Sequence, residues 1–147
     1  MSRFFLVFLT LTILWGCAGE SPEKYVQEGF VHFQKQEYDQ AIASYQKAIN
    51  LDPRAAAVYN MLGMAYRFKY NQLGTPELRD KEIAAFNKAI ETDPKAWVAM
   101  VNLGATYNAQ GQKAKAAALL KKVLELHPDH PEKAQMEKII AEGQGKP

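Results

Sequence analysis

The stretch DQAIASYQKAINLDP at residues 39–53 returns at residues 80–94 as DKEIAAFNKAIETDP, and more than half of the positions are identical. Each copy ends in an Asp-Pro pair, at Pro53 and at Pro94. A catalytic loop occurs once in a domain, whereas self-similarity at a fixed spacing is typical of stacked structural units. The chain is therefore expected to be built from repeats.

A third unit ends at Pro128, which lies 34 residues after Pro94, and 34 residues is the period of the tetratricopeptide repeat. The three units share residues at the same spacings. The first unit has Tyr25, Gly29, His32, Ala41, Tyr45 and Pro53, and the second has Tyr59, Leu62, Gly63, Tyr66, Phe86 and Pro94. The third unit has Met100, Leu103, Gly104, Tyr107, Ala116, Leu120 and Pro128. This pattern resembles the tetratricopeptide repeat (TPR) family over roughly residues 22 to 128. Glu82 departs from it, because alanine is usual at that position.

The resemblance implies an all-α fold, a TPR helix-turn-helix solenoid of three hairpins plus a C-terminal capping helix. Proline pairs and turn residues place helices near 22–35, 38–50, 54–70, 76–92, 95–109, 112–126 and 131–142. The second unit has seven extra residues, with a loop expected at 71–74. These residues either form a tolerated surface insertion or a lip on which Tyr70 and Leu73 contact a partner.

The three repeat glycines lie in the middle of a predicted helix, where glycine costs about 1 kcal/mol relative to alanine. We expect the second helix of each hairpin to approach closely at these points, through small residues such as Ala41 and Ala116. In the last helix Lys138 occupies the glycine position. A long charged side chain forbids such an approach, so this helix is expected to be a cap, with Met136 and two isoleucines covering the last hairpin.

The N-terminal segment has the pattern of a bacterial secretory signal. Arg3 is followed by an uncharged apolar run and by Leu14-Trp15-Gly16-Cys17, which resembles a lipobox. The resemblance implies cleavage before Cys17 and lipidation of its thiol, and Ala18 after it indicates the outer membrane, facing the periplasm. The alternative is an uncleaved N-terminal anchor. The predicted division is 1–16 signal peptide, 17–21 lipidated cysteine and tether, 22–55 first repeat, 56–96 second repeat with the insertion, 97–130 third repeat, and 131–147 capping helix and tail.

Composition excludes several kinds of function. The formal net charge is only +2 and no run of basic residues stands out, so nucleic acid is not an expected partner. A single cysteine excludes an internal disulfide or a cysteine-rich zinc site. The HPDHP sequence at 127–131 is explained by a helix junction. With no phosphate loop and no acid–base cluster, the sequence predicts no enzyme, no cofactor, no metal and no small-molecule substrate.

The family resemblance implies that a peptide or helix of a partner binds the surface made by the first helix of each hairpin. On this chain that surface would carry Val26, Phe30, Phe33, Asn60, Met64, Arg67, Phe68, Val98, Val101, Asn102 and Asn108. Apolar groups would hold side chains and amides would bond the backbone. Some family members grip chaperone C-termini with lysines and asparagines, but of the matching positions here only Asn102 could take part.

We therefore expect a membrane-anchored interaction scaffold that binds a protein partner in envelope assembly, attached to lipid through Cys17. The alternative is an auxiliary regulator or docking subunit for a cell-wall enzyme. Neither reading assigns the chain a reaction of its own.

Overall fold

The computed structural model describes residues 20–145, and this part of the chain is all-α, as predicted. Its helices are α1 (Pro22–Gln34), α2 (Tyr38–Leu51), α3 (Ala56–Leu73), α4 (Pro76–Thr92), α5 (Trp97–Ala109), α6 (Lys113–Leu126) and α7 (Lys133–Gly143). None of these helices has the length and hydropathy of a membrane span.

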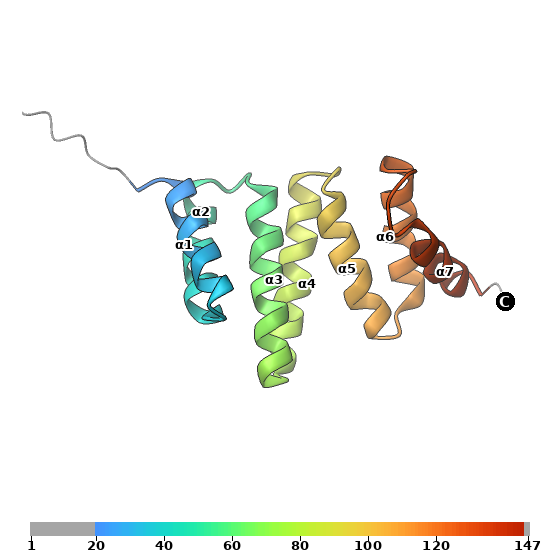
Figure 1. The fold of residues 1–147 in the computed structure, drawn as a ribbon, viewed down its shortest axis with the longest axis horizontal. Helices are drawn as coiled ribbons and strands as arrows, with labels where there is room; N and C mark the ends of the chain where they lie inside the picture. Colours follow the sequence, from blue (N-terminus) through green and yellow to red (C-terminus); the bar gives the residue numbers. More distant parts are fainter. Residues whose placement is uncertain (1–19, 146–147) are drawn as a thin grey trace, which may run out of the picture.

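Consecutive helices pack as antiparallel hairpins, which stand side by side in a row (Figure 1). The most extensive packing is between α1 and α2, α3 and α4, α5 and α6, and α6 and α7. The hairpins are joined through α2 with α3 and α4 with α5. Each hairpin buries an apolar face that it cannot cover alone, so the neighbouring hairpins complete the core. This is the predicted helix-turn-helix solenoid.

Two helices begin at a proline, as the sequence predicts. Pro22 and Pro76 occupy the first turns of α1 and α4, where a missing N–H removes no helical hydrogen bond. Ser21 also caps α1, because its hydroxyl accepts a hydrogen bond from the Lys24 N–H at 3.3 Å.

The expected helix starts at 54, 95 and 131 are each two residues too early. Asp52 does not cap a helix that begins at Pro53. Its carboxylate accepts a hydrogen bond from the N–H of Arg54 at 3.0 Å, which closes a turn, and α3 begins at Ala56. The same aspartate turn recurs at residues 93–97. At the third start the ring of His130 accepts the Glu132 N–H instead.

The loop expected at 71–74 is wrong, because α3 continues through Leu73. Gly74 ends the helix with a φ of +68°, and its N–H bonds the Tyr70 carbonyl at 2.7 Å. With 18 residues in α3 and 17 in α4, against 13 or 14 in the helices of the other hairpins, the extra residues lengthen both helices. The α3–α4 hairpin therefore projects beyond its neighbours (Figure 1).

The repeat glycines do sit at close helix contacts. A Cβ added at Gly63 would lie 2.6 Å from the ring of Phe86, and one at Gly29 would lie 2.6 Å from the ring of Tyr45. Small residues such as Ala41 and Ala116 were expected at these contacts, but rings of the second helix are nearest at Gly29 and Gly63. Of the two alanines, only Ala116 is among the nearest neighbours, and it is so at Gly104. Gly104 is less crowded, because its nearest neighbour is a Leu120 methyl at 3.2 Å.

Helix α7 closes the array against α6. Met136 is buried with Leu120 and Val123, while Lys138 is exposed, as expected for a cap. The Glu142 carboxylate accepts a hydrogen bond from the Lys113 ammonium at 2.7 Å, which lowers the pKa of that carboxyl. A polar outer face on a terminal helix prevents further stacking.

Candidate partner-binding groove

A first hollow, of about 150 Å³, lies where α1 meets α3. Its lining is apolar except for one amide: Phe30, Phe33, Tyr45, Asn60, Met61 and Met64. Phe30 is 44% exposed, so part of its ring is available for contact, whereas Tyr45 is 2% exposed. Burial raises the pKa of Tyr45 above its usual range, so its phenol stays protonated and uncharged.

A second hollow, of about 300 Å³, lies where α3 meets α5. It is lined by Ala56, Ala57, Asn60, Met61, Asp93, Lys95, Ala96, Trp97, Val98 and Ala99. Val98 is 44% exposed. The hollow is open because the alanines in its lining have small side chains, and Trp97 and Met61 supply apolar surface. The charges of Asp93 and Lys95 are opposite, so they give this hollow no net charge.

The two hollows adjoin on α3, because Asn60 and Met61 line both of them. Residues three and four apart share one face of a helix, so Ala57, Asn60, Met61 and Met64 form a single stripe. We call the two hollows and this stripe the groove. The groove is mostly apolar, with one amide at its middle and the opposite charges of Asp93 and Lys95 in its second hollow. Such a lining suits a peptide better than a charged small molecule.

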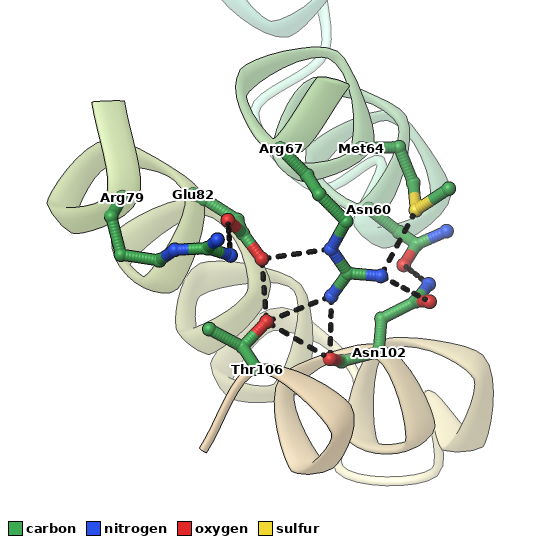
Figure 2. A network of polar contacts seen from close by, with 7 residues as sticks. All are labelled: Asn60, Met64, Arg67, Arg79, Glu82, Asn102 and Thr106. Carbon is green, nitrogen blue, oxygen red and sulfur yellow. Dashed lines mark hydrogen bonds and ion pairs between the residues drawn. The ribbon is translucent and has the colours of Figure 1, made fainter. Parts of the chain in front are cut away.

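A buried carboxylate organises the polar side chains beside the groove (Figure 2). Glu82 is fully buried and pairs with Arg67 at 2.9 Å and with Arg79 at 2.5 Å. The Thr106 hydroxyl donates a hydrogen bond to the same carboxylate and accepts one from Arg67. We call Arg67, Arg79, Glu82, Asn102 and Thr106 the Glu82 network.

Aromatic rings support both guanidinium groups of the Glu82 network. Arg67 lies over the ring of Phe86 at 5.0 Å, and Arg79 lies over the ring of Tyr70 at 3.9 Å. Every fully buried side-chain nitrogen and oxygen among the described residues has a hydrogen-bond partner. The network is therefore satisfied, and it ties α3 to α4 and α5.

The Glu82 network reaches the groove through two amides. Arg67 donates to the side-chain oxygen of Asn102 at 3.2 Å and to its backbone carbonyl at 2.6 Å. The Asn102 amide nitrogen then donates to the Asn60 side-chain oxygen at 2.9 Å. The orientation of Asn60 is thus set by an ion pair deeper in the fold.

Some of the residues predicted for the binding surface lie together. Phe30, Phe33, Asn60 and Met64 line the first hollow, and Asn60 and Val98 line the second. Arg67 and Asn102 instead belong to the Glu82 network, where their polar groups are bonded within the fold.

The other predicted residues lie apart. Phe68 packs in an aromatic cluster at the hairpin end, with its ring centroid 5.3 Å from Phe33 and 5.8 Å from Tyr38. Val26, Val101 and Asn108 line neither hollow.

Three residues of the site and its support were not predicted for it. Met61 and Trp97 line the groove, and Glu82 holds the network beside it. Glu82 gave a signal in the sequence, because an acidic residue stood where the repeat usually has alanine. Met61 and Trp97 gave none, since apolar residues on a helix are most often core. The predicted lipidation site, Cys17, lies outside the described residues. Across residues 20–145, no three histidine, acidic or cysteine side chains gather as metal ligands would.

Comparison with protein families finds two matches in this sequence. Residues 29–67 match a family described as "TPR repeat", and residues 83–138 match one described as "Tetratricopeptide repeat". Together the two matches span more than half of the chain. No curated protein sequence matches it.

Solved structures with this fold include three recorded with a bound peptide or partner. The first TPR of Spaghetti (RPAP3), bound to the HSP90 peptide SRMEEVD, is 21% identical with a TM-score of 0.71, over 86% of this chain and 94% of that one. The TPR2B domain of yeast Sti1, in complex with pHsp70, is 21% identical with a TM-score of 0.67, over 84% and 96%. The Yersinia enterocolitica chaperone SycD, with a peptide of the translocator YopD, is 17% identical with a TM-score of 0.69, over 83% and 91%. These likenesses establish the fold.

Proposed function

The chain is a tetratricopeptide repeat protein, and we propose that it is an interaction scaffold whose groove binds a peptide segment of a partner protein. The observation that carries this proposal is the pair of adjoining apolar hollows across α1, α3 and α5. Apolar hollows of this kind hold side chains of a guest, while polar groups fix its main chain. The scaffold has no reaction of its own in this proposal.

Solved relatives support a peptide as the class of guest, because RPAP3 and SycD are each described with a peptide bound. An acidic chaperone tail is not proposed for this chain. A terminal carboxylate needs a cation. The lining of the first hollow has no charged residue, and in the second hollow Lys95 lies with Asp93, whose charge is opposite. Asn102, the one matching clamp position, is already bonded to Arg67.

We further propose that lipid on Cys17 anchors the scaffold to a membrane, at the outer membrane facing the periplasm, where it serves envelope assembly. The lipobox-like sequence at residues 14–17 supports the anchor. Attachment through more than one acyl chain is stable, because each buried CH₂ contributes about 0.8 kcal/mol. Only a short tether of 17–21 separates Cys17 from α1, so the groove would lie near the membrane.

Substituting glutamate for Phe30 and Met64 together is expected to weaken peptide binding at least about tenfold, because each carboxylate would be desolvated in an apolar hollow without a partner. The ligands are peptides selected from a displayed library of random internal segments on the full chain, and affinity is measured by fluorescence anisotropy. Leu51→Glu is the matched control, because Leu51 is also 44% exposed but lies on α2, away from the groove. Equal affinity of the groove variant, with helicity intact, would place binding elsewhere.

Cys17→Ser is expected to abolish incorporation of radiolabelled palmitate and to release the chain from membranes of the expressing cell. The hydroxyl of serine does not replace the thiol that receives the lipid. The measurement is labelling and fractionation of intact and substituted chains expressed side by side. Equal labelling of the two chains would contradict the lipid anchor while leaving the groove proposal unaffected.

A further inference from the structure

We propose that Asn60 donates a hydrogen bond to a main-chain carbonyl of an extended guest segment, whose apolar side chains at positions i and i+2 occupy the two hollows. This inference rests on the proposed function and specifies the guest. It assigns recognition of the main chain to Asn60 and not to Asn102.

The orientation of Asn60 follows from hydrogen-bond chemistry. A guanidinium can only donate, so the atom of Asn102 that faces Arg67 Nη1 must be the side-chain oxygen. The amide nitrogen of Asn102 then faces Asn60 and requires an acceptor there, which is Asn60 Oδ1 at 2.9 Å. Asn60 Nδ2 is consequently turned away from the Glu82 network (Figure 2).

The donor of this relay is itself held firmly. Arg67 Nε bonds the buried Glu82 carboxylate at 2.9 Å, and Nη2 bonds the Asn102 carbonyl at 2.6 Å and the Thr106 hydroxyl at 2.8 Å. A guanidinium bonded on three sides cannot rotate to release Asn102. The Asn60 amide is therefore pre-organised, which reduces the entropy lost when a guest binds.

Asn60 Nδ2 has two N–H groups and no hydrogen-bond partner within residues 20–145. Because Asn60 lines both hollows, this donor pair lies between two spaces whose linings are mostly apolar. The guest must therefore offer a hydrogen-bond acceptor flanked by apolar groups. A peptide carbonyl between two apolar side chains meets this requirement.

The need for an available carbonyl selects an extended guest over a helical one. Carbonyls inside an α-helix are already bonded to N–H groups four residues on, whereas those of an extended segment are available. In an extended segment, residues i and i+2 point to the same side and are separated by about 6.5 to 7 Å. One such pair can place one side chain in each hollow, on either side of Asn60 and Met61, which line both hollows.

The test uses peptides selected on the full chain from a library of random internal segments. Selected sequences are expected to be enriched in an apolar-x-apolar pattern. Each peptide bond of a selected peptide is then replaced in turn by an ester, which weakens the carbonyl as an acceptor. One ester is expected to reduce affinity for the natural chain about 3- to 10-fold, the effect of one lost hydrogen bond.

The deciding comparison is between Asn60→Ala and its matched control Asn108→Ala, an asparagine that lines neither hollow. Affinity for the same ester peptide is expected to equal that for the amide peptide in Asn60→Ala, whereas Asn108→Ala keeps the full ester effect. An ester effect that persists in Asn60→Ala would overturn this inference and leave the proposed function standing, as would selected peptides with apolar residues at helical spacing. If no peptide is enriched, or if the Phe30→Glu, Met64→Glu chain binds equally well, both proposals fail.

Discussion

Glu82→Ala is expected to lower the free energy of unfolding by about 3 to 5 kcal/mol, because it leaves two guanidinium groups facing a space that no carboxylate fills. Arg67 and Arg79 are only 18% and 17% exposed in their side chains, so water replaces the lost partner poorly. At about 4 °C per kcal/mol, the midpoint of thermal unfolding should fall by more than about 10 °C. Far-UV circular dichroism on heating measures this change.

Two further variants show whether the loss of stability comes from the buried ion pairs of Glu82 or from removal of any carboxylate. Glu91→Ala removes an exposed ion pair with Lys88 and should change stability by less than about 0.5 kcal/mol. Adding Arg67→Met to Glu82→Ala should restore part of the lost stability, since it removes one of the two guanidinium groups left without a carboxylate while Arg79 remains. An unchanged midpoint for Glu82→Ala would show that the Glu82 network contributes nothing to the fold.

Phe86→Ala is expected to lower the free energy of unfolding by about 3 to 5 kcal/mol, because the ring is fully buried and its removal leaves a cavity. The ring also fills the space over Gly63 and lies under the guanidinium of Arg67. Its loss therefore loosens both the α3–α4 contact and the Glu82 network. Urea unfolding of the variant and the natural chain gives the difference.

Gly63→Ala tests whether the Phe86 ring packs directly against Gly63. In the natural chain it should destabilise, because the new Cβ would lie 2.6 Å from the Phe86 ring. In the Phe86→Ala chain the same change should be neutral or stabilise by up to about 1 kcal/mol, since the ring is gone and alanine favours helix. Gly104→Ala is the matched control, and its contact at 3.2 Å with a flexible leucine should yield. Identical effects of Gly63→Ala in both backgrounds would contradict the close contact.

The repeated pattern was sufficient to predict the fold, because each hairpin has the same packing problem and solves it with the same positions. Gly63 is a mid-helix glycine that only a close contact explains, and the structure confirms that contact. The sequence did not identify the contacting side chain, which in the structure is the ring of Phe86. A glycine shows that space is needed but not what occupies it.

Helix boundaries were less accurate where a side chain competes with the helix for the first N–H groups. Asp52 precedes a proline in a sequence that is also typical of a helix start. In the structure its carboxylate closes a turn with Arg54, and the helix begins later. The local sequence permits both arrangements, and packing of the hairpins decides between them.

The residues predicted for the candidate site include Asn60 and part of its apolar lining, but the contacts of the Glu82 network were not predicted. The family resemblance placed Phe30, Asn60 and Met64 on this surface, and all three line the first hollow. The role of Arg67 could not be read in this way, because its partners Glu82 and Thr106 are 15 and 39 residues away and meet it only in the folded chain. A residue on the right face can still have all its polar groups engaged internally.

Because α3 contributes lining to both hollows, exchanging one of the three hairpins would change a different number of hollows depending on which hairpin is exchanged. In the proposed binding mode, exchange of the first hairpin for that of a relative would alter the side chain accepted at one guest position, and exchange of the third would alter the other. Exchange of the middle hairpin would alter both at once and remove Asn60 as well. New binding preferences in such a lineage should therefore arise stepwise from the two ends of the array, with the central hairpin changing last.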